Sequence, residues 1–399
     1  MEEIERMFLS EMTEMAEYYE ESLRVHAKHK GKLEVQGKVP LKTEEDLRVA
    51  LMPGVAEPCL LIERTPEDAR KYTIKANTIA VVSDGSAVAG LGNIGGLAAL
   101  PLIEGKALLF KELGGVDAFP ICLSTQDVDE IVLTVKNISP GFGGICLESI
   151  KAPECFEIEK RLREELDIPV FSDSGQGIAA AVCAAVINSF RLTGKSLSDV
   201  RAVVCGAGAS GSAITKMLVQ LGLRDLVICD SKGIISASRI SEFEEDKLEL
   251  LELTNKDGLS GNLQDAIKDR DLFIGVSKPG VLTEVMIRSM AKNPVIFTLS
   301  NPEPEISLEH AKAGGAGIVA TGSSLSPNHI SSMLISPGIF RGVLDADVSE
   351  ITEEMLLAAT RALATLVSDK ELSEDSILPS VLSEDVAAAI AKVVAEIRK

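Results

Sequence analysis

Short apolar runs and longer mixed segments alternate through most of the chain after residue 77. The runs at 78–83, 201–205 and 225–230 are bounded by glycine or polar residues, which is the pattern of buried strands. Because helix-length segments separate them, the alternation predicts βαβ units with parallel pairing. We therefore expect an α/β fold with two domains, one of which holds a doubly wound parallel sheet.

The two ends of the chain predict helices instead. Apolar residues between positions 4 and 25 recur at helical spacing, which favours a core helix or a contact with another subunit. The segments 352–367 and 383–397 each begin with a polar capping residue followed by acids in the first turn. We expect these C-terminal helices to pack back on the first domain.

A second strand–helix cycle starts at Val200. We expect a first domain, for substrate, over residues 1–160, a second, for a nucleotide, over 161–345 and the C-terminal helices over 346–399. Within the first domain, the run at 98–105 predicts a short helix and the run at 106–110 predicts a further strand.

Composition narrows the classes of function. Apolar residues make up 46% of the chain and aromatic residues 4%, so aliphatic side chains must form the cores, as in a parallel sheet buried on both faces. A net charge of −20 repels phosphate backbones, so we expect no nucleic acid partner. Seven cysteines without a CxxC pair indicate reduced thiols and a cytoplasmic protein. No run of about 18 apolar residues appears, so we expect no membrane span.

The pattern G-x-G-x-x-G occurs at 90–95 and again at 206–211. Only the second copy stands between a predicted strand and a clean predicted helix, which is the context of a Rossmann-like dinucleotide site. Its glycines let the backbone approach a pyrophosphate, and the helix N-terminus supplies amide donors. The residues of this site are Gly206, Gly208, Ala209, Ser210 and Gly211. The first copy is expected to shape a substrate cleft.

The strand after the second glycine loop ends in Asp230, followed by Ser231. A carboxylate at this place can accept hydrogen bonds from ribose hydroxyls, which favours NAD over NADP. Lys232 leaves NADP open, because a cation here could meet a 2′-phosphate.

A third feature is the turn FSDSGQGIA at 171–179, which joins a predicted strand to a predicted helix. Polar turns at this place carry the chemistry of many α/β proteins. Here the turn holds one carboxylate, Asp173, between Ser172 and Ser174. The pattern leaves open whether the turn is a working metal or acid–base site or one that has lost ligands.

Long ordered runs make the chain resemble the malic enzymes of the smaller prokaryotic type, over nearly its whole length. The resemblance implies NAD(P)-dependent oxidation of malate and decarboxylation to pyruvate and CO₂, with Mg²⁺ or Mn²⁺ polarising the ketone. It also implies a homodimer or a larger homo-oligomer. The matching stretches include PGVAEPC (53–59), residues 81–123, FGGICLE (142–148), VVCGAGASG (203–211), CDSKG (229–233), SNPEPEI (300–306) and SPGIFRGVLD (336–345).

Carried over by this resemblance, the family's proton-accepting lysine falls on Lys106 and its metal-binding glutamate on Glu148. The first acid of its Asp-Asp pair falls on Asp173, which is a possible second metal ligand. The asparagine that contacts substrate and the nicotinamide ribose falls on Asn301.

Five positions depart from the family's pattern. The family's proton-donating tyrosine is replaced by Leu51, two metal-binding aspartates by Ser149 and Ser174, and two substrate-binding asparagines by Ser331 and Ser332. Because Mg²⁺ and Mn²⁺ prefer charged oxygen ligands, these changes predict weakened metal binding. Lys106 alone could still support oxidation at C2 if burial lowers its pKa.

Three functions stay open at this point. The first is an NAD(P)-dependent malic enzyme that acts on a small dicarboxylic acid, with full activity or impaired by the substitutions. The second is an oxidoreductase for a smaller or less polar hydroxy acid. The third is a non-catalytic homologue that binds nucleotide or serves as a regulatory subunit.

Overall fold

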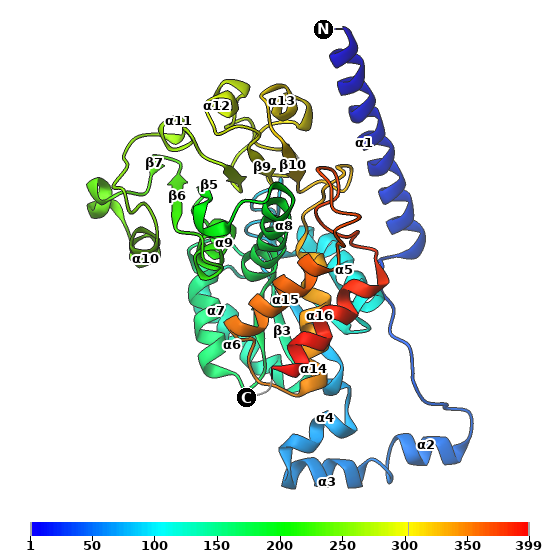
Figure 1. Cartoon of the computed structure of the whole chain (residues 1–399). Coiled ribbons are helices and arrows are strands. Elements are labelled where there is room, and N and C mark those ends of the chain that lie inside the picture. Colours follow the sequence, from blue (N-terminus) through cyan, green and yellow to red (C-terminus); the bar gives the residue numbers. More distant parts are fainter. Residues whose placement is uncertain (1, 302, 398–399) are drawn as a thin grey trace.

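The computed structural model of this chain describes residues 2–301 and 303–397, with side chains described from residue 16 onward. Two sheets, joined by a central layer of helices, form the body of the molecule (Figure 1). The first sheet has the order β2-β1-β3-β4 and is parallel throughout. Its strands are β1 (Thr78–Ser83), β2 (Asp117–Cys122), β3 (Gly144–Leu147) and β4 (Val170–Ser172).

The second sheet has the order β10-β9-β8-β5-β6-β7, and only β7 runs antiparallel to its neighbour. This doubly wound sheet confirms the predicted α/β fold with a Rossmann-like domain. Its strands are β5 (Arg201–Cys205), β6 (Asp225–Asp230), β7 (Gly233–Ile234), β8 (Leu272–Gly275), β9 (Val295–Thr298) and β10 (Ile318–Thr321). Strand β4 begins after residue 160 and completes the first sheet. The sheets alone do not fix where one domain ends, and the boundaries at 160 and 345 stay predictions.

Helices cover the two sheets and fill the space between them (Figure 1). The α-helices up to the second sheet are α1 (Glu2–His29), α2 (Glu44–Ala50), α3 (Ala56–Arg64), α4 (Ala69–Tyr72), α5 (Gly95–Gly114), α6 (Val128–Ile138), α7 (Glu154–Glu165) and α8 (Ile178–Thr193). Those that follow are α9 (Ala209–Gln220), α10 (Glu245–Leu253), α11 (Leu263–Ala266), α12 (Glu284–Arg288), α13 (Leu308–Ala313), α14 (Ser336–Ala346), α15 (Glu353–Thr365) and α16 (Glu384–Glu396). Short 3₁₀ turns are η1 (Pro66–Asp68), η2 (Ile74–Ala76), η3 (Ser139–Gly141), η5 (Leu197–Asp199), η6 (Ala237–Glu242) and η7 (Ser332–Leu334).

The predicted strand at 106–110 is wrong, because these residues belong to the single helix α5. A five-residue apolar run is compatible with a strand or with a helix, and only the spacing of apolar residues over a longer segment distinguishes these two structures. Over that segment the buried residues Ala99, Ile103, Ala107 and Phe110 recur every three or four positions, which is the period of a helix. Lys106 therefore projects from a helix rather than from the start of a strand.

The two C-terminal helices are confirmed as α15 and α16. Helix α16 packs on α14 and also contacts α5 of the first domain. Two glycines one turn apart on α14 allow this close approach, since a Cβ on Gly338 would lie 2.6 Å from Cβ of Ile390. A Cβ on Gly342 would lie 2.7 Å from Cβ of Val394.

Helix α1 confirms the predicted N-terminal helix, and it projects from the body of the molecule (Figure 1). The apolar residues of its first half lie outside the described side chains. Of the others, Tyr19 is 58% exposed and Leu23 is 74% exposed, so they do not belong to the core of this chain. The segment from α2 to α4 forms a second projection (Figure 1).

One helical segment in the described residues, Asp173–Thr193, is long and apolar enough to cross a membrane, but it is largely buried in the centre of the protein. It is the core helix against which α9 and α15 pack. All seven cysteines are free thiols, in agreement with the prediction.

Candidate active site

Three of the predicted site residues meet at the carboxyl edge of the first sheet. Glu148 directly follows β3 and Asp173 directly follows β4, so these neighbouring parallel strands deliver both carboxylates to one place. Helix α5 brings Lys106 between them. Its Nζ forms ion pairs with Asp173 and with Oε2 of Glu148, the latter at 3.1 Å.

Asp173 is enclosed by donors, and we call this set of side chains the Asp173 network (Lys106, Asp173, Ser332 and Ser336). Ser332 donates to Oδ2 of Asp173 at 2.6 Å, Ser336 donates to Oδ1, and Ser332 Oγ also lies 3.1 Å from Nζ of Lys106. Gly177 makes room for the network, because a Cβ there would lie 3.0 Å from Oγ of Ser336. The side chain of Asp173 is 1% exposed, so its charge is balanced inside the protein.

Lys106, Asp173 and Glu148 shift one another's pKa values. Burial lowers the pKa of Lys106, but the negative charges of Asp173 and Glu148 outweigh burial and raise this pKa above its usual value. Burial raises the pKa of Asp173, but the ammonium and the hydrogen bonds outweigh burial and lower this pKa to about 2. Burial raises the pKa of Glu148 to about 7, against the charge of Lys106. The pKa of Lys106 is therefore raised and not lowered, and its role as the proton acceptor stays a prediction.

Beside it lies a second set of contacts, the Glu148 network (Glu148, Ser149 and Ser174). Oε1 of Glu148 accepts a hydrogen bond from Ser149 Oγ at 3.0 Å and another from Ser174 Oγ at 3.3 Å. The backbone N–H of Ser149 donates to Ser174 Oγ at 3.3 Å. The fold thus gathers both substituted positions, Ser149 and Ser174, around a single oxygen atom of Glu148.

The residues present do not fit a divalent metal ion. Mg²⁺ and Mn²⁺ are held by several hard oxygen ligands, and charged ligands supply much of the affinity. The Glu148 network offers one carboxylate and two hydroxyls, and the hydroxyls already donate to that carboxylate. Among the residues that the structure describes, no group of three or more His, Cys, Asp or Glu side chains is placed to hold a metal.

Other predicted site residues lie elsewhere. Leu51 caps the end of α2 on the second projection, with 59% of its surface exposed, and the structure does not bring it to Lys106. Ser331 accepts a hydrogen bond from the N–H of Met333 and starts the turn that carries Ser332. Asn301 follows β9 and is exposed, and its side chain donates to the carbonyl of Gly322 at 3.4 Å.

The second glycine loop has the geometry that a pyrophosphate requires. Gly206 has φ +121°, and a Cβ there would lie 2.5 Å from the carbonyl oxygen of Val276. A Cβ on Gly211 would lie 1.8 Å from the carbonyl oxygen of Gly206, so this glycine lets α9 pack closely on its strand. Nothing lies within 4 Å of a Cβ on Gly208, which leaves the loop open where a phosphate would approach.

The dinucleotide loop touches the acid site directly. Ser210, in the first turn of α9, donates to the carbonyl oxygen of Ser174 at 2.7 Å. The turn that carries Asp173 is a single π-turn, η4 (Asp173–Gly177), and α9 packs against it. A dinucleotide bound at this loop would therefore lie beside the turn that carries Asp173.

Asp230 ends β6, as predicted, but its carboxylate already accepts four hydrogen bonds within the protein. Oδ1 accepts from the N–H of Lys232 at 2.9 Å and from Arg239 at 3.0 Å. Oδ2 accepts from Arg239 and from Lys247, each at 2.9 Å. These partners lower the pKa of Asp230, although burial opposes them. The ribose role of Asp230, and that of the neighbouring Ser231, stay predictions.

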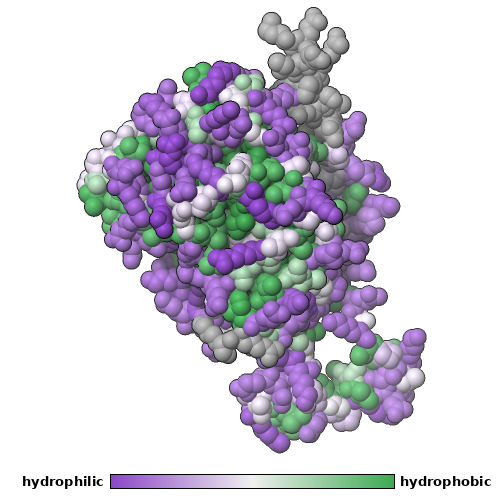
Figure 2. All heavy atoms as spheres, viewed as in Figure 1, coloured by the Kyte–Doolittle hydropathy of each residue, from purple (hydrophilic) through white to green (hydrophobic). Residues whose placement is uncertain are grey.

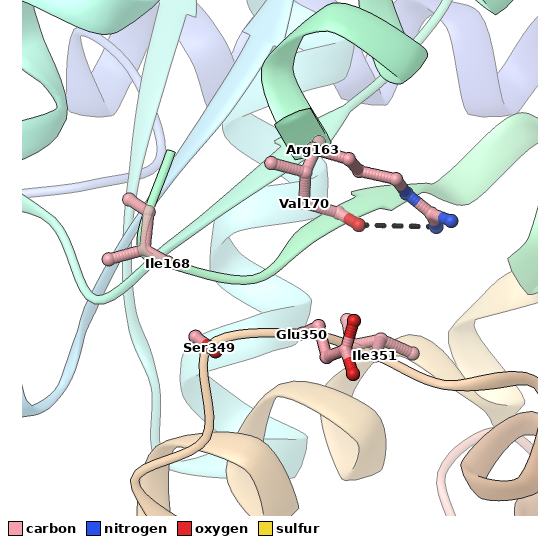
Figure 3. A pocket seen from close by; sticks show the side chains of 6 residues that line it. All are labelled: Arg163, Ile168, Val170, Ser349, Glu350 and Ile351. Carbon is pink, nitrogen blue, oxygen red and sulfur yellow. Dashed lines mark hydrogen bonds between the residues drawn. The ribbon is translucent and has the colours of Figure 1, made fainter. Parts of the chain in front are cut away.

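The first glycine loop forms a tight turn that leads into α5, in which the N–H of Gly92 donates to the carbonyl of Val88. A small pocket elsewhere lies between Arg163 of α7, the start of β4 and the segment before α15 (Figure 3). Arg163 there donates to the carbonyl of Val170 at 3.4 Å. This pocket is at the opposite end of β4 from Asp173, and it does not belong to the acid site.

Sequence reasoning missed three residues of these networks: Ser336, Arg239 and Lys247. Ser336 stands in the motif SPGIF, but serine is common where a helix begins, so the motif alone gives no sign of a contact with Asp173. Arg239 and Lys247 are 9 and 17 residues from Asp230, and only the tertiary structure shows that they meet it.

Comparison with known proteins agrees with this arrangement. The two sheets and the dinucleotide loop define a two-domain dinucleotide-binding protein. Residues 30–163 match the family described as malic enzyme, N-terminal domain, and residues 175–398 match the malic enzyme, NAD binding domain. The chain therefore belongs to the malic enzyme family.

Individual relatives cover most of the chain. It is 51% identical over 377 residues to the bifunctional malic/malolactic enzyme of Bacillus subtilis, covering 94% of this chain and 92% of that one. It is 47% identical to the NADP-dependent malic enzyme of Escherichia coli over 339 residues, 84% of this chain and 44% of the relative. The solved structure of the NAD-dependent malic enzyme of Thermotoga maritima superposes with a TM-score of 0.90 at 44% identity, covering 94% and 98% of the two chains.

Proposed function

We propose that this protein is an NAD(P)-dependent oxidoreductase that oxidises malate and decarboxylates the product to pyruvate and CO₂. The contact between Ser210 and the carbonyl of Ser174 carries the proposal, because it joins the dinucleotide loop to the turn that holds Asp173. Family membership and relatives named as NAD- and NADP-dependent malic enzymes support the same reaction.

The chain's own residues would bind and orient the substrate. The ammonium of Lys106 can donate a hydrogen bond to the C2 oxygen or a carboxylate of malate. Oxidation at C2 also releases the proton of the C2 hydroxyl group, and Lys106 would accept that proton once it has passed its own to Oε2 of Glu148, 3.1 Å away. Glu148 and Asp173 hold that ammonium in place, and Asn301 would contact substrate and the nicotinamide ribose. The dinucleotide, when bound, supplies the hydride acceptor. No step is assigned to a divalent metal, because the Glu148 network does not fit one.

A non-catalytic homologue that binds dinucleotide is the second candidate. The observation in its favour is the closed Asp173 network, in which Lys106 keeps its proton and Asp173 accepts hydrogen bonds from three side chains. With Leu51 in place of the family's tyrosine, the described site residues offer no phenol group. Positioned acid–base groups typically contribute about 10²–10⁴ in rate, so their loss would leave binding without appreciable turnover.

A steady-state assay separates these candidates. Purified protein with malate and NAD or NADP is expected to form reduced dinucleotide and pyruvate in equal amounts. Reduction with another hydroxy acid but not with malate would point to changed substrate specificity. Dinucleotide binding by calorimetry without turnover of any acid would support the non-catalytic candidate and contradict the proposal.

The substitutions themselves can be tested by reversal. The double change Ser149→Asp and Ser174→Asp, assayed with Mn²⁺, is expected to raise turnover by about 10²-fold or more, because it restores two charged ligands beside Glu148. The control is Ser149→Asn with Ser174→Asn, which has closely similar side-chain shapes without the charges. Equal turnover in the two variants would show that the lost groups are not the defect.

We also propose that the chain forms a homodimer or a larger homo-oligomer in the cytoplasm. The segment between α1 and α4 carries exposed apolar side chains, and Figure 2 shows them among polar ones on the lower projection. An exposed apolar surface of this kind marks a contact site. The most exposed of these residues are Val35, Val39, Leu41, Val49, Leu51 and Met52. Light scattering after size-exclusion chromatography tests the assembly.

A further inference from the structure

We propose that Ser149 and Ser174 close the metal site of the family with a hydroxyl network, so that this protein handles its ligands without a divalent cation. The inference concerns the cleft of the proposed function, and its test does not depend on turnover. Two features of the Glu148 network and its surroundings support it, and a third makes its test possible.

The first feature is that the hydroxyls bind the carboxylate instead of a cation. Ser149 and Ser174 both direct their protons to Oε1 of Glu148, at 3.0 and 3.3 Å. An oxygen that accepts two hydrogen bonds in a buried site has its charge satisfied by the protein. A divalent cation would have to break these two hydrogen bonds, and Glu148 is the one charged ligand that it would then bind in this network.

The second feature is that neither neighbouring charge is free to help. Asp173 accepts hydrogen bonds from Lys106, Ser332 and Ser336, and its side chain is 1% exposed. The ammonium of Lys106 lies 3.1 Å from Oε2 of Glu148, so it already supplies the positive charge that this carboxylate requires. A second cation beside Glu148 would be repelled by the first.

The third feature is the backbone of Ser149, which has φ +57°. This left-handed conformation is uncommon for serine, whereas aspartate and asparagine adopt it several times more often. The fold thus keeps a backbone shape that suits a short acidic side chain at this position, although the carboxylate itself is gone. Restoring the acid should therefore not disturb the turn.

The experiment is a Mn²⁺ titration of the full chain, followed by electron paramagnetic resonance of the free ion. The wild-type protein is expected to leave Mn²⁺ free throughout the micromolar range. The double variant Ser149→Asp/Ser174→Asp is expected to bind Mn²⁺ on the order of a hundredfold more tightly than wild type, because it restores two charged oxygen ligands.

The matched control is Ser149→Asn/Ser174→Asn, which adds the same atoms without charge and also tolerates the backbone of residue 149. It is expected to bind Mn²⁺ no better than wild type. Dinucleotide binding by calorimetry reports whether each variant is folded. If the double aspartate variant is not folded, the single variants replace it, each with an expected gain of about tenfold.

Two results would overturn the inference. One is micromolar binding of Mn²⁺ by the wild-type protein, which needs no variant at all. The other is a folded aspartate variant that binds Mn²⁺ no more tightly than its asparagine control. Neither result depends on malate turnover, so a failure of the proposed function and a failure of this inference give different data.

Discussion

The dinucleotide loop and the turn that carries Asp173 lie in contact, but the backbone forms the first site and side chains form the second. In the loop, the N–H groups and the absence of side chains at Gly206, Gly208 and Gly211 make the site. In the turn and its neighbours, side-chain charge makes the site, and serine stands at two positions where the family has aspartate. Substitution of side chains can therefore change the chemistry of the turn while the adjacent glycine loop keeps its shape.

The largest expected effect concerns the stability of the acid site. Lys106→Met leaves two buried carboxylates without their cation, and breaking a buried ion pair in this way typically costs about 3–5 kcal/mol. Urea unfolding at pH 7 measures the loss. Lys111→Met is the control on the same helix, since this exposed lysine pairs with Asp117 at 2.7 Å and should change stability by less than about 1 kcal/mol. Equal losses in the two variants would mean that Lys106 is not the counter-ion of the site.

The dinucleotide loop should respond through its backbone instead. Gly211→Ala places a Cβ 1.8 Å from the carbonyl oxygen of Gly206, which should destabilise the fold by about 1–3 kcal/mol. Gly208 has φ −90° and open space around its Cβ, so Gly208→Ala should leave the melting temperature nearly unchanged. That same change should weaken dinucleotide binding by about tenfold, because the methyl group fills the space of the phosphate. Melting curves measure the stability of both variants, and calorimetry measures their affinity for the dinucleotide. If Gly208→Ala binds the dinucleotide as tightly as the wild type does, the predicted role of this glycine is wrong.

The charge balance around Glu148 predicts a pH dependence that the glycine loop cannot have. The pKa of Glu148 is about 7 in the folded protein and lies near its usual 4.5 in the unfolded chain. The stability that this group contributes is therefore fully present below about pH 4.5 and is lost as the pH rises through about 7. Glu148→Gln has no carboxyl group to lose a proton. As the pH rises from about 4.5 to about 7, the melting temperature of this variant should therefore rise relative to that of the wild type.

The control for this pH series is Glu249→Gln, which changes an exposed glutamate that pairs with Lys216. Its difference from wild type should stay constant over the same range. A flat difference for Glu148→Gln as well would contradict the raised pKa.

The smallest expected effect concerns the choice between NAD and NADP. Asp230 accepts hydrogen bonds from Lys232, Arg239 and Lys247, and the two cationic side chains among these partners balance its charge. If Asp230 lies near the ribose, as the sequence predicts, Lys232 is close enough to meet a 2′-phosphate. Lys232→Glu should weaken NADP by up to about fivefold and leave NAD unchanged, since an exposed charge contributes about 0.2–1 kcal/mol. Lys312→Glu, on α13 beside the opposite edge of the sheet, is the control. Equal changes for both dinucleotides would exclude a contact of Lys232 with the 2′-phosphate.

Local patterns were sufficient for most of the fold. The strands β5 and β6 and the helices α15 and α16 were predicted within about two residues, because short apolar runs and capping residues are local signals. The run at 106–110 was not, because an apolar pentapeptide suits both helix and strand until the segment around it is packed. That error also misplaced Lys106, since a helix sends this side chain between two strand ends.

The sequence by itself determined which groups are present: one lysine, two carboxylates, and serines where the family has acids. The tertiary structure decided how they pair, because Ser332 and Ser336 are more than 150 residues from Asp173 in the chain and still donate to it. It also showed that Lys106 pairs with both carboxylates, whereas their hydrogen bonds from serine differ: Ser332 and Ser336 donate to Asp173, and Ser149 and Ser174 donate to Glu148. Hydrogen bonds and ion pairs act over a few ångströms of space and not over sequence, so only the folded chain shows which charge each proton satisfies.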